Sequence, residues 1–183
     1  MKPIKIGVVS ILEGDAYKET KRMWWLFEKK YNSRAIQNFP HPHLSFQGGI
    51  CEDVKIIDAN LKKLSLRMKP FLIRTEGINT FKKPERVIFW EVVKTKTLQR
   101  VHHKIDAFFR KYCSQTFKLY SPQNWHPHVT LAQGDLSQGN FQKAKKDLEN
   151  YNPRYRFKVH NICLVRWYDK DKKIRIYRKH VLK

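Results

Sequence analysis

A short motif occurs twice in this 183-residue chain, and the two copies lie almost half a chain apart. Residues 37–49 read QNFPHPHLSFQGG and residues 123–134 read QNWHPHVTLAQG, so that His128 follows His43 by 85 positions. Self-similarity at a fixed offset indicates a duplicated architecture. We therefore expect a single domain made of two pseudo-symmetric halves, about residues 1–85 and 86–183.

The pattern of apolar residues predicts nearly the same order of elements in each half. Segments rich in β-branched and aromatic residues predict strands at residues 4–12, 43–47, 71–81, 86–93, 128–133, 155–167 and 174–182. Apolar residues three or four positions apart predict helices at about residues 16–31, 54–68, 98–112 and 141–151. Asp15 and Thr97 are expected to cap the first and third helices. A helix therefore flanks each copy of the motif on both sides.

Side chains alternate between the two faces of an extended segment, and this gives the motif its chemical meaning. His43 and Ser45 are expected on one face, and His128 and Thr130 likewise share a face in the second copy. A neutral imidazole can remove a proton from an attacking hydroxyl or water, and a protonated one can donate to the leaving oxygen. The two hydroxyls can donate hydrogen bonds to non-bridging phosphate oxygens. This set of residues suits phosphodiester cleavage without a metal or other cofactor.

The paired segments His43-Leu44-Ser45-Phe46 and His128-Val129-Thr130-Leu131 resemble the H-Φ-(S/T)-Φ signature of the 2H phosphoesterase superfamily, where Φ is apolar. The chain resembles the branch of 2′-5′ RNA ligases and RNA 2′,3′-cyclic phosphodiesterases over essentially its whole length. The resemblance implies a bilobal α+β fold, with two antiparallel-rich sheets around a central cleft and helices on the outside. It also implies hydrolysis of RNA 2′,3′-cyclic phosphate ends or 2′-5′ linkages, with ligation as the reverse reaction.

By the same resemblance His43 and His128 are the catalytic residues, and Ser45 and Thr130 bind the substrate phosphate. The first motif has Ser where many relatives have Thr, a difference that keeps the hydroxyl. The sequence does not distinguish the general acid from the general base. Trp125 comes just before the second motif and is a candidate to stack on a base at the edge of the groove.

Two other interpretations of the same residues remain open. His41 and His126 complete two His-Pro-His pairs, and His-x-His can chelate zinc, so the chain could be a metal-dependent hydrolase. No carboxylate accompanies either motif in the sequence, and the repeated hydroxyls have no role at such a centre, so we expect no metal site. A groove that kept RNA binding and lost turnover is the second alternative.

The charge of the chain favours a nucleic-acid partner. Lys and Arg number 38 against 16 Asp and Glu, a formal net charge of +22. A field of this size attracts polyanions, and nucleic acid is the commonest in cells, so RNA or an oligonucleotide is the expected partner. No amphipathic membrane-surface helix and no membrane span stand out. The three cysteines form no metal or disulfide framework. We expect a cytoplasmic monomer without an obligate protein partner.

Overall fold

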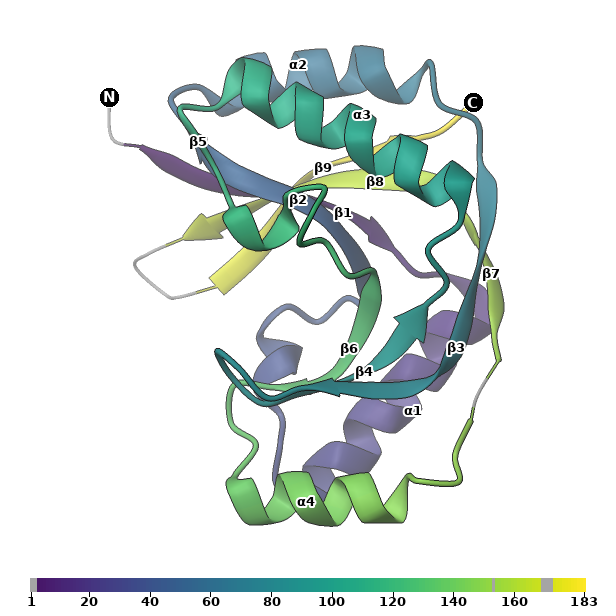
Figure 1. The fold of residues 1–183 in the computed structure, drawn as a ribbon. Coiled ribbons are helices and arrows are strands. Elements are labelled where there is room, and N and C mark those ends of the chain that lie inside the picture. The colour runs from purple at the N-terminus through teal and green to yellow at the C-terminus, as the bar shows by residue number, and fades with distance from the viewer. Residues whose placement is uncertain (1–2, 153, 169–172) are drawn as a thin grey trace.

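Two antiparallel sheets face each other across the centre of the molecule, with helices on their outer sides (Figure 1). The computed structural model describes residues 3–152, 154–168 and 173–183. The five-stranded sheet has the order β5-β2-β1-β8-β9 and the four-stranded sheet the order β6-β4-β3-β7. The strands are β1 (Ile4–Ile11), β2 (His43–Cys51), β3 (Phe71–Phe81), β4 (Val87–Val92), β5 (Gln115–Thr116), β6 (His128–Gln133), β7 (Arg156–Val159), β8 (Asn161–Tyr168) and β9 (Lys173–Val181). The predicted α+β class with two antiparallel sheets is confirmed.

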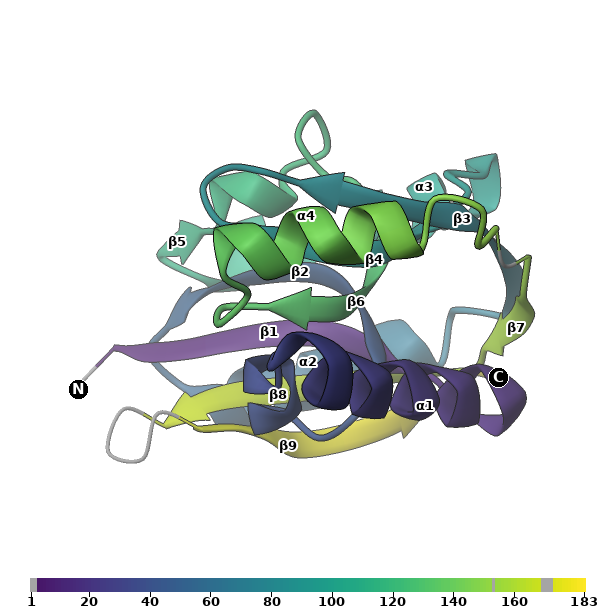
Figure 2. The same ribbon diagram turned by 90° about the horizontal axis from the view of Figure 1, so that it is seen from below.

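Four α-helices cover the outer sides of the two sheets: α1 (Gly14–Tyr31), α2 (Val54–Ser65), α3 (Lys96–Tyr112) and α4 (Gln138–Asp147). Helices α2 and α3 pack on the five-stranded sheet, whereas α1 and α4 lie side by side next to the four-stranded sheet (Figure 2). Two 3-10 turns, η1 (Ala35–Asn38) and η2 (Lys118–Tyr120), precede the two motif strands. Among the described residues, no helix combines the length and apolar character needed to cross a bilayer.

The helix starts differ from the two caps that the sequence suggested. Helix α1 begins at Gly14 after an extended Glu13, so Asp15 lies in the first turn. There the positive end of the helix dipole stabilises its negative charge. Helix α3 is capped two residues earlier than expected, because Thr95 accepts a hydrogen bond from the Leu98 amide. The predictions of Asp15 and Thr97 as N-caps were therefore wrong. Polar residues two positions apart offer equivalent local hydrogen bonds, and the tertiary packing selects one.

Each sheet draws strands from both sides of residue 85. Strand β3, the next strand after the first motif strand β2, joins the four-stranded sheet, while β8 from the C-terminal part joins the five-stranded sheet. The sequence predicted one strand over residues 155–167, but the chain forms two strands there in different sheets, with His160 at the corner. The apolar pattern continues through the corner because β7 buries alternate side chains and β8 buries all of its first five, so the local sequence does not show the break.

The two strands that carry the motifs are open at their edges where they approach each other. Strand β6 is the edge of its sheet, and β2 is covered by β5 only at Gly49 and Ile50. Strands β2 and β6 contact each other, and two buried indoles satisfy carbonyls on the open edges. Trp125 Nε1 donates to the Ser45 carbonyl at 3.0 Å, and Trp24 Nε1 donates to the Thr130 carbonyl at 2.9 Å. This contact between the two strand edges brings the two motifs to one place between the sheets.

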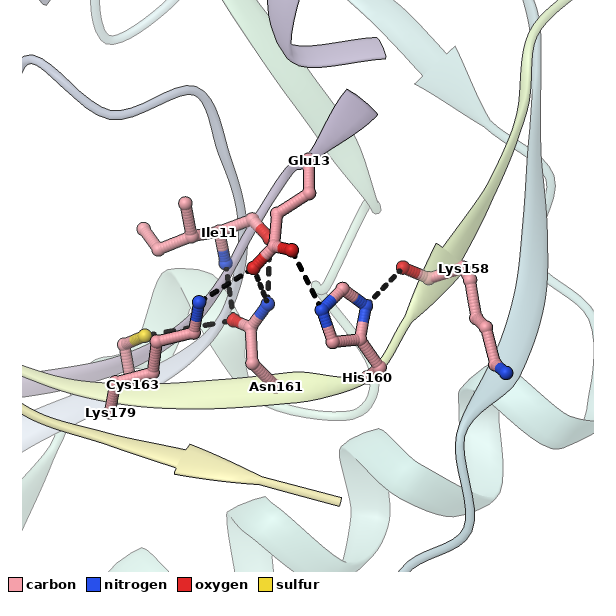
Figure 3. Close-up of polar contacts among 7 residues, drawn as sticks. All are labelled: Ile11, Glu13, Lys158, His160, Asn161, Cys163 and Lys179. Carbon is pink, nitrogen blue, oxygen red and sulfur yellow. Dashed lines mark hydrogen bonds and ion pairs between the residues drawn. The ribbon is translucent and has the colours of Figure 1, made fainter. Parts of the chain in front are cut away.

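A polar network fixes the corner where the chain passes from one sheet to the other (Figure 3). Asn161 is completely buried, and its side chain exchanges two hydrogen bonds of 2.9 Å with the backbone N–H and C=O of Ile11. Glu13 accepts hydrogen bonds from Lys179 Nζ at 2.6 Å and His160 Nε2 at 2.9 Å. The amide of Asn161 therefore continues the β1–β8 ladder after its backbone pairs end at Val9.

We predict that Asn161→Ala lowers the free energy of unfolding by about 2–4 kcal/mol, because it leaves a buried N–H and a buried C=O of Ile11 without partners. Urea denaturation measures the change. The exposed Asn79, whose side chain donates to Glu91 and accepts from the Thr80 amide at the surface, gives a matched control, and Asn79→Ala should cost less than about 0.5 kcal/mol. Equal effects of the two substitutions would show that the corner does not depend on the Asn161 amide.

Candidate active site

The alternation predicted for the first motif is present in β2. Leu44 and Phe46 are fully buried beneath the sheet, whereas His43 and Ser45 are half-buried and line a cavity between the sheets. In β6 Val129 is fully buried and His128 is half-buried.

Thr130 differs from Ser45 in its exposure. Its side chain is 8% exposed and borders neither of the cavities that His43 and His128 line. The two hydroxyls of the repeat are therefore not equivalent, because Ser45 is open to the cavity while Thr130 lies deeper.

Two adjoining cavities run between the sheets. One of about 450 Å³ is bordered by His43 and Ser45, and another of about 140 Å³ by His128. Tyr120 and Gln133 line both of them, so the cavities meet between the two motifs. A ligand in this groove would lie between strands that come from different sheets.

Both imidazoles are held by the same backbone hydrogen bond. His43 Nδ1 lies 2.8 Å from the carbonyl oxygen of His41, and His128 Nδ1 lies 2.7 Å from that of His126. A carbonyl oxygen accepts only, so each Nδ1 carries the proton and donates. In the neutral ring Nε2 is then the free base, and in the protonated ring it is the available acid. The residue two positions before each histidine thus sets its tautomer.

Aromatic rings pack against both histidines and reduce their exposure to water. Phe39 packs edge-on against His43 at 5.0 Å between ring centroids, and Phe81 and Phe89 pack against His128 at 5.2 and 4.9 Å. Burial lowers the pKa of His43 and lowers that of His128 to about 4. Charge on His43 further lowers the pKa of His128, so the two imidazoles influence each other's protonation.

Trp125 does not lie where a base could stack on it. The side chain is 3% exposed, and its ring stacks on His102 with centroids 3.9 Å apart and planes 12° apart. Its indole N–H supports the Ser45 carbonyl. The structure therefore does not support the base-stacking prediction, and Trp125 holds the β2 backbone. His102 of α3 is 1% exposed and completes this stack.

A buried hydrogen-bond network behind the groove involves residues that the sequence did not identify as site residues. Asp106 of α3 accepts hydrogen bonds from Gln47 Nε2 at 2.6 Å and from Arg110 Nε at 2.7 Å. Gln47 and His102 both lie within hydrogen-bond distance of the Tyr120 carbonyl, at 3.2 and 2.9 Å. These contacts fix the segment that carries Tyr120 against β2.

Tyr120 itself reaches the first motif. Burial raises the pKa of its phenol, and the Ser45 hydroxyl beside it acts in the opposite direction. The sequence offered no local signal for this residue beyond its aromatic character, because it precedes the second motif but borders the first.

The outer histidines of the repeat lie beside other groups. His126 Nε2 is 3.3 Å from a carboxylate oxygen of Glu91 on β4, and His41 packs against Phe39. Glu91 thus places a carboxylate close to the second motif, although Glu91 lies far from that motif in the sequence. Within residues 3–152, 154–168 and 173–183, no group of three or more His, Cys, Asp or Glu side chains could hold a metal ion.

Comparison with known proteins agrees with the fold and the motif. Residues 16–171 match the family model of the 2′-5′ RNA ligase superfamily, so the chain belongs to that superfamily. The family resemblance inferred from the paired motifs is thereby confirmed.

Solved structures share the fold at low sequence identity. Escherichia coli LigT in its apo form has a TM-score of 0.65 at 14% identity, covering 100% of this chain and 99% of LigT. The protein TT0787 of Thermus thermophilus also has a TM-score of 0.65, at 15% identity and with 97% of each chain covered.

Two curated relatives from Staphylococcus epidermidis, one of them named "Putative phosphoesterase SERP0604", are 26% identical over 113 residues. The match covers 61% of this chain and 63% of each relative's length.

We predict that Phe81→Ala raises the pKa of His128 from about 4 toward 6.5, because it opens one aromatic wall of the site to water. Titration of the imidazole signals by NMR measures the change. Phe71→Ala, at the other end of the same strand, is the matched control and should leave the pKa of His128 unchanged. A fall in the pKa of His128 in Phe81→Ala would refute the assigned role of the aromatic wall.

Proposed function

We propose that this chain is a metal-independent phosphoesterase that hydrolyses RNA 2′,3′-cyclic phosphate ends or 2′-5′ phosphodiester linkages, with His43 and His128 as the acid–base pair. One observation carries the proposal: the two imidazoles border adjoining cavities and each keeps its Nε2 free of the hydrogen bond that holds Nδ1. Membership of the 2′-5′ RNA ligase superfamily supports this reaction class. So does LigT, whose solved structures include complexes with phosphate and with 3′-AMP.

The proposed step needs one neutral and one protonated histidine. The neutral Nε2 accepts a proton from water while the water oxygen bonds to phosphorus. The bond from phosphorus to the ribose oxygen breaks, and that oxygen takes the Nε2 proton of the second histidine. The first histidine gains one proton and the second histidine loses one. Proton exchange with solvent then restores the starting protonation states of the pair. Ser45, beside the cavity, and Thr130, deeper in β6, are proposed to stabilise the charge on the non-bridging oxygens.

The histidine assignment predicts that His43→Ala and His128→Ala each lower kcat by about 10²–10⁴-fold on a 2′,3′-cyclic phosphate oligonucleotide. The loss in the double variant should be smaller than the product of the single losses, because the two act as one unit. His103→Ala, on the exposed side of α3, is the matched control and should retain activity.

The same variants separate the proposal from its alternatives. A non-catalytic RNA-binding protein would show no turnover to lose, and a metal hydrolase would lose activity in excess chelator, where the proposed enzyme retains it. A panel of 2′,3′-cyclic, 2′-5′ and 3′-5′ oligonucleotides identifies the substrate. Unchanged hydrolysis in both histidine variants would refute the mechanism.

The lowered pKa values predict an acidic optimum. The form of the free enzyme with one neutral and one protonated imidazole is most abundant between the two pKa values. The pH dependence of kcat/KM reports these pKa values of the free enzyme. Both values lie below 6.5, and that of His128 is about 4. We expect kcat/KM to peak on the acid side of pH 6.5 and to fall once the pH drops below both pKa values. A pH–rate profile with its maximum above pH 7 would contradict the acid–base pair.

A further inference from the structure

The exposed face of α3, on the outer side of the five-stranded sheet, is positively charged along its whole length (Figure 1). Asp106 is the only acidic residue of this helix, and it is 4% exposed and paired with Arg110 at 2.7 Å. The exposed residues that are neither Lys nor Arg are His103 and Ala107, which add no permanent charge. The exposed cations are Lys96, Arg100, Lys104, Arg110 and Lys111.

Three of these cations, Lys96, Arg100 and Lys104, form a cationic row that neighbouring acids do not neutralise. Within the part of the chain that the structure describes, the row makes no ion pair. The exposed cations of α1 differ in this respect, because each of three lies beside a carboxylate. These pairs are Lys18 with Asp15 at 3.9 Å, Arg22 with Glu19 at 2.5 Å and Lys30 with Asp147 at 2.7 Å. The field of the row therefore extends into solvent.

The cationic row is unfavourable for the helix that carries it. Its members are four residues apart, so adjacent side chains are neighbours on the helix surface, and like charges at this spacing are destabilising. Lys96 also lies in the first turn, where the helix dipole disfavours a positive charge, and no acidic residue lies there to offset it. The fold gains nothing from this arrangement, which indicates that an anion outside the chain compensates it.

Helix α3 lies directly behind one wall of the smaller cavity. Tyr120 and Trp125 line that cavity together with His128. On the other side of this wall, His102 of α3 stacks on Trp125 with centroids 3.9 Å apart, and its Nε2 lies 2.9 Å from the Tyr120 carbonyl oxygen. Lys94, between β4 and α3, donates to the Trp125 carbonyl at 2.9 Å. The cationic row begins two residues after Lys94 and therefore starts beside the second motif.

The groove itself contains little of the positive charge of the chain. Of the described residues that line its two cavities, Lys5 and Lys83 are the only Lys or Arg. The formal net charge of the chain is nevertheless +22. A ligand confined to the groove would meet few of these cations, whereas a longer polyanion that leaves the groove over the Tyr120 segment would reach those of α3.

From these observations we propose that the cationic row of α3 binds the phosphate backbone of a single-stranded RNA whose end lies in the groove. Lysine binds phosphate as a point charge, and arginine can hold it through two parallel hydrogen bonds. The row is about 12 Å long at about 1.5 Å per helical residue. This length exceeds the rise of about 3.4 Å per nucleotide in a stacked strand, so the row can contact more than one phosphate. The proposal rests on the proposed function for the reacting end, and it adds that the preferred substrate is a polynucleotide.

Equilibrium binding tests this surface without any need for turnover. An RNA of about 12 nucleotides, within the usual range of single-strand site sizes, and a dinucleotide are titrated calorimetrically, each with a 3′-phosphate. We expect the natural chain to bind the longer RNA more tightly. The triple variant Lys96→Gln, Arg100→Gln, Lys104→Gln should lose most of this difference. For the longer RNA, its slope of log K against log salt concentration should be smaller by about 2, since each phosphate contact contributes about 0.7.

A second triple variant gives a matched control for the loss of charge. Lys29→Gln, Lys143→Gln, Lys145→Gln removes the same charge from exposed positions on α1 and α4, and it should keep the preference for the longer RNA. Urea denaturation checks that the α3 variant is folded. This variant should be at least as stable as the natural chain, because it relieves repulsion between like charges along the helix.

The α3 surface is refuted if its triple variant keeps the preference for the longer RNA, or if the control variant loses that preference equally. It is also refuted if the α3 variant binds both RNAs more weakly by the same factor. Polyglutamate tests the alternative of an acidic protein partner, and the RNA proposal is wrong if polyglutamate binds as tightly as the longer RNA and depends equally on the row. Turnover in the histidine variants is a separate readout, so this proposal and the proposed function can fail independently.

Discussion

An exposed strand edge can pair with the edge of another chain. In this fold two strand edges pack against each other instead. Strands β2 and β6 belong to different sheets, and over their motif residues neither has a backbone partner on the side where they meet. The indoles of Trp125 and Trp24 satisfy one carbonyl on each edge while filling the space between them. The position of each motif therefore depends on packing from elsewhere in the chain, and the groove exists because the two sheets meet along their open edges.

The repeat supplies equal chemical groups in unequal surroundings. Both histidines have the same tautomer through the same local hydrogen bond, because the His-Pro-His turn is repeated. Their neighbours differ, since the His43 ring packs against Phe39 and the His128 ring packs against both Phe81 and Phe89. Together with the two cavity sizes, these differences give each side of the groove a distinct character that the repeat itself does not encode.

The sequence predicted those features that depend on residues close together in the chain. Alternation in β2 followed from the order His-Leu-Ser-Phe, and the helices followed from apolar spacing. The break at His160 was missed because the two strands beside it differ only in which distant strands they pair with. The role of Trp125 was mispredicted for a related reason, since its burial against His102 arises from α3 packing on β2. Glu91 and Tyr120 reach the motifs from other elements, and nothing in their local sequence marks them.

The passage of β3 and β8 into opposite sheets also governs how the groove can assemble. The five-stranded sheet cannot gain its β1–β8 ladder until the last quarter of the chain has been made, and the four-stranded sheet needs β3 from the first half. Contacts of such long sequence separation form slowly, because the intervening loop must close first. A nascent chain that has emerged only as far as the first motif thus holds His43 with no completed sheet beneath it, and the complete groove forms only after synthesis of β8 and β9.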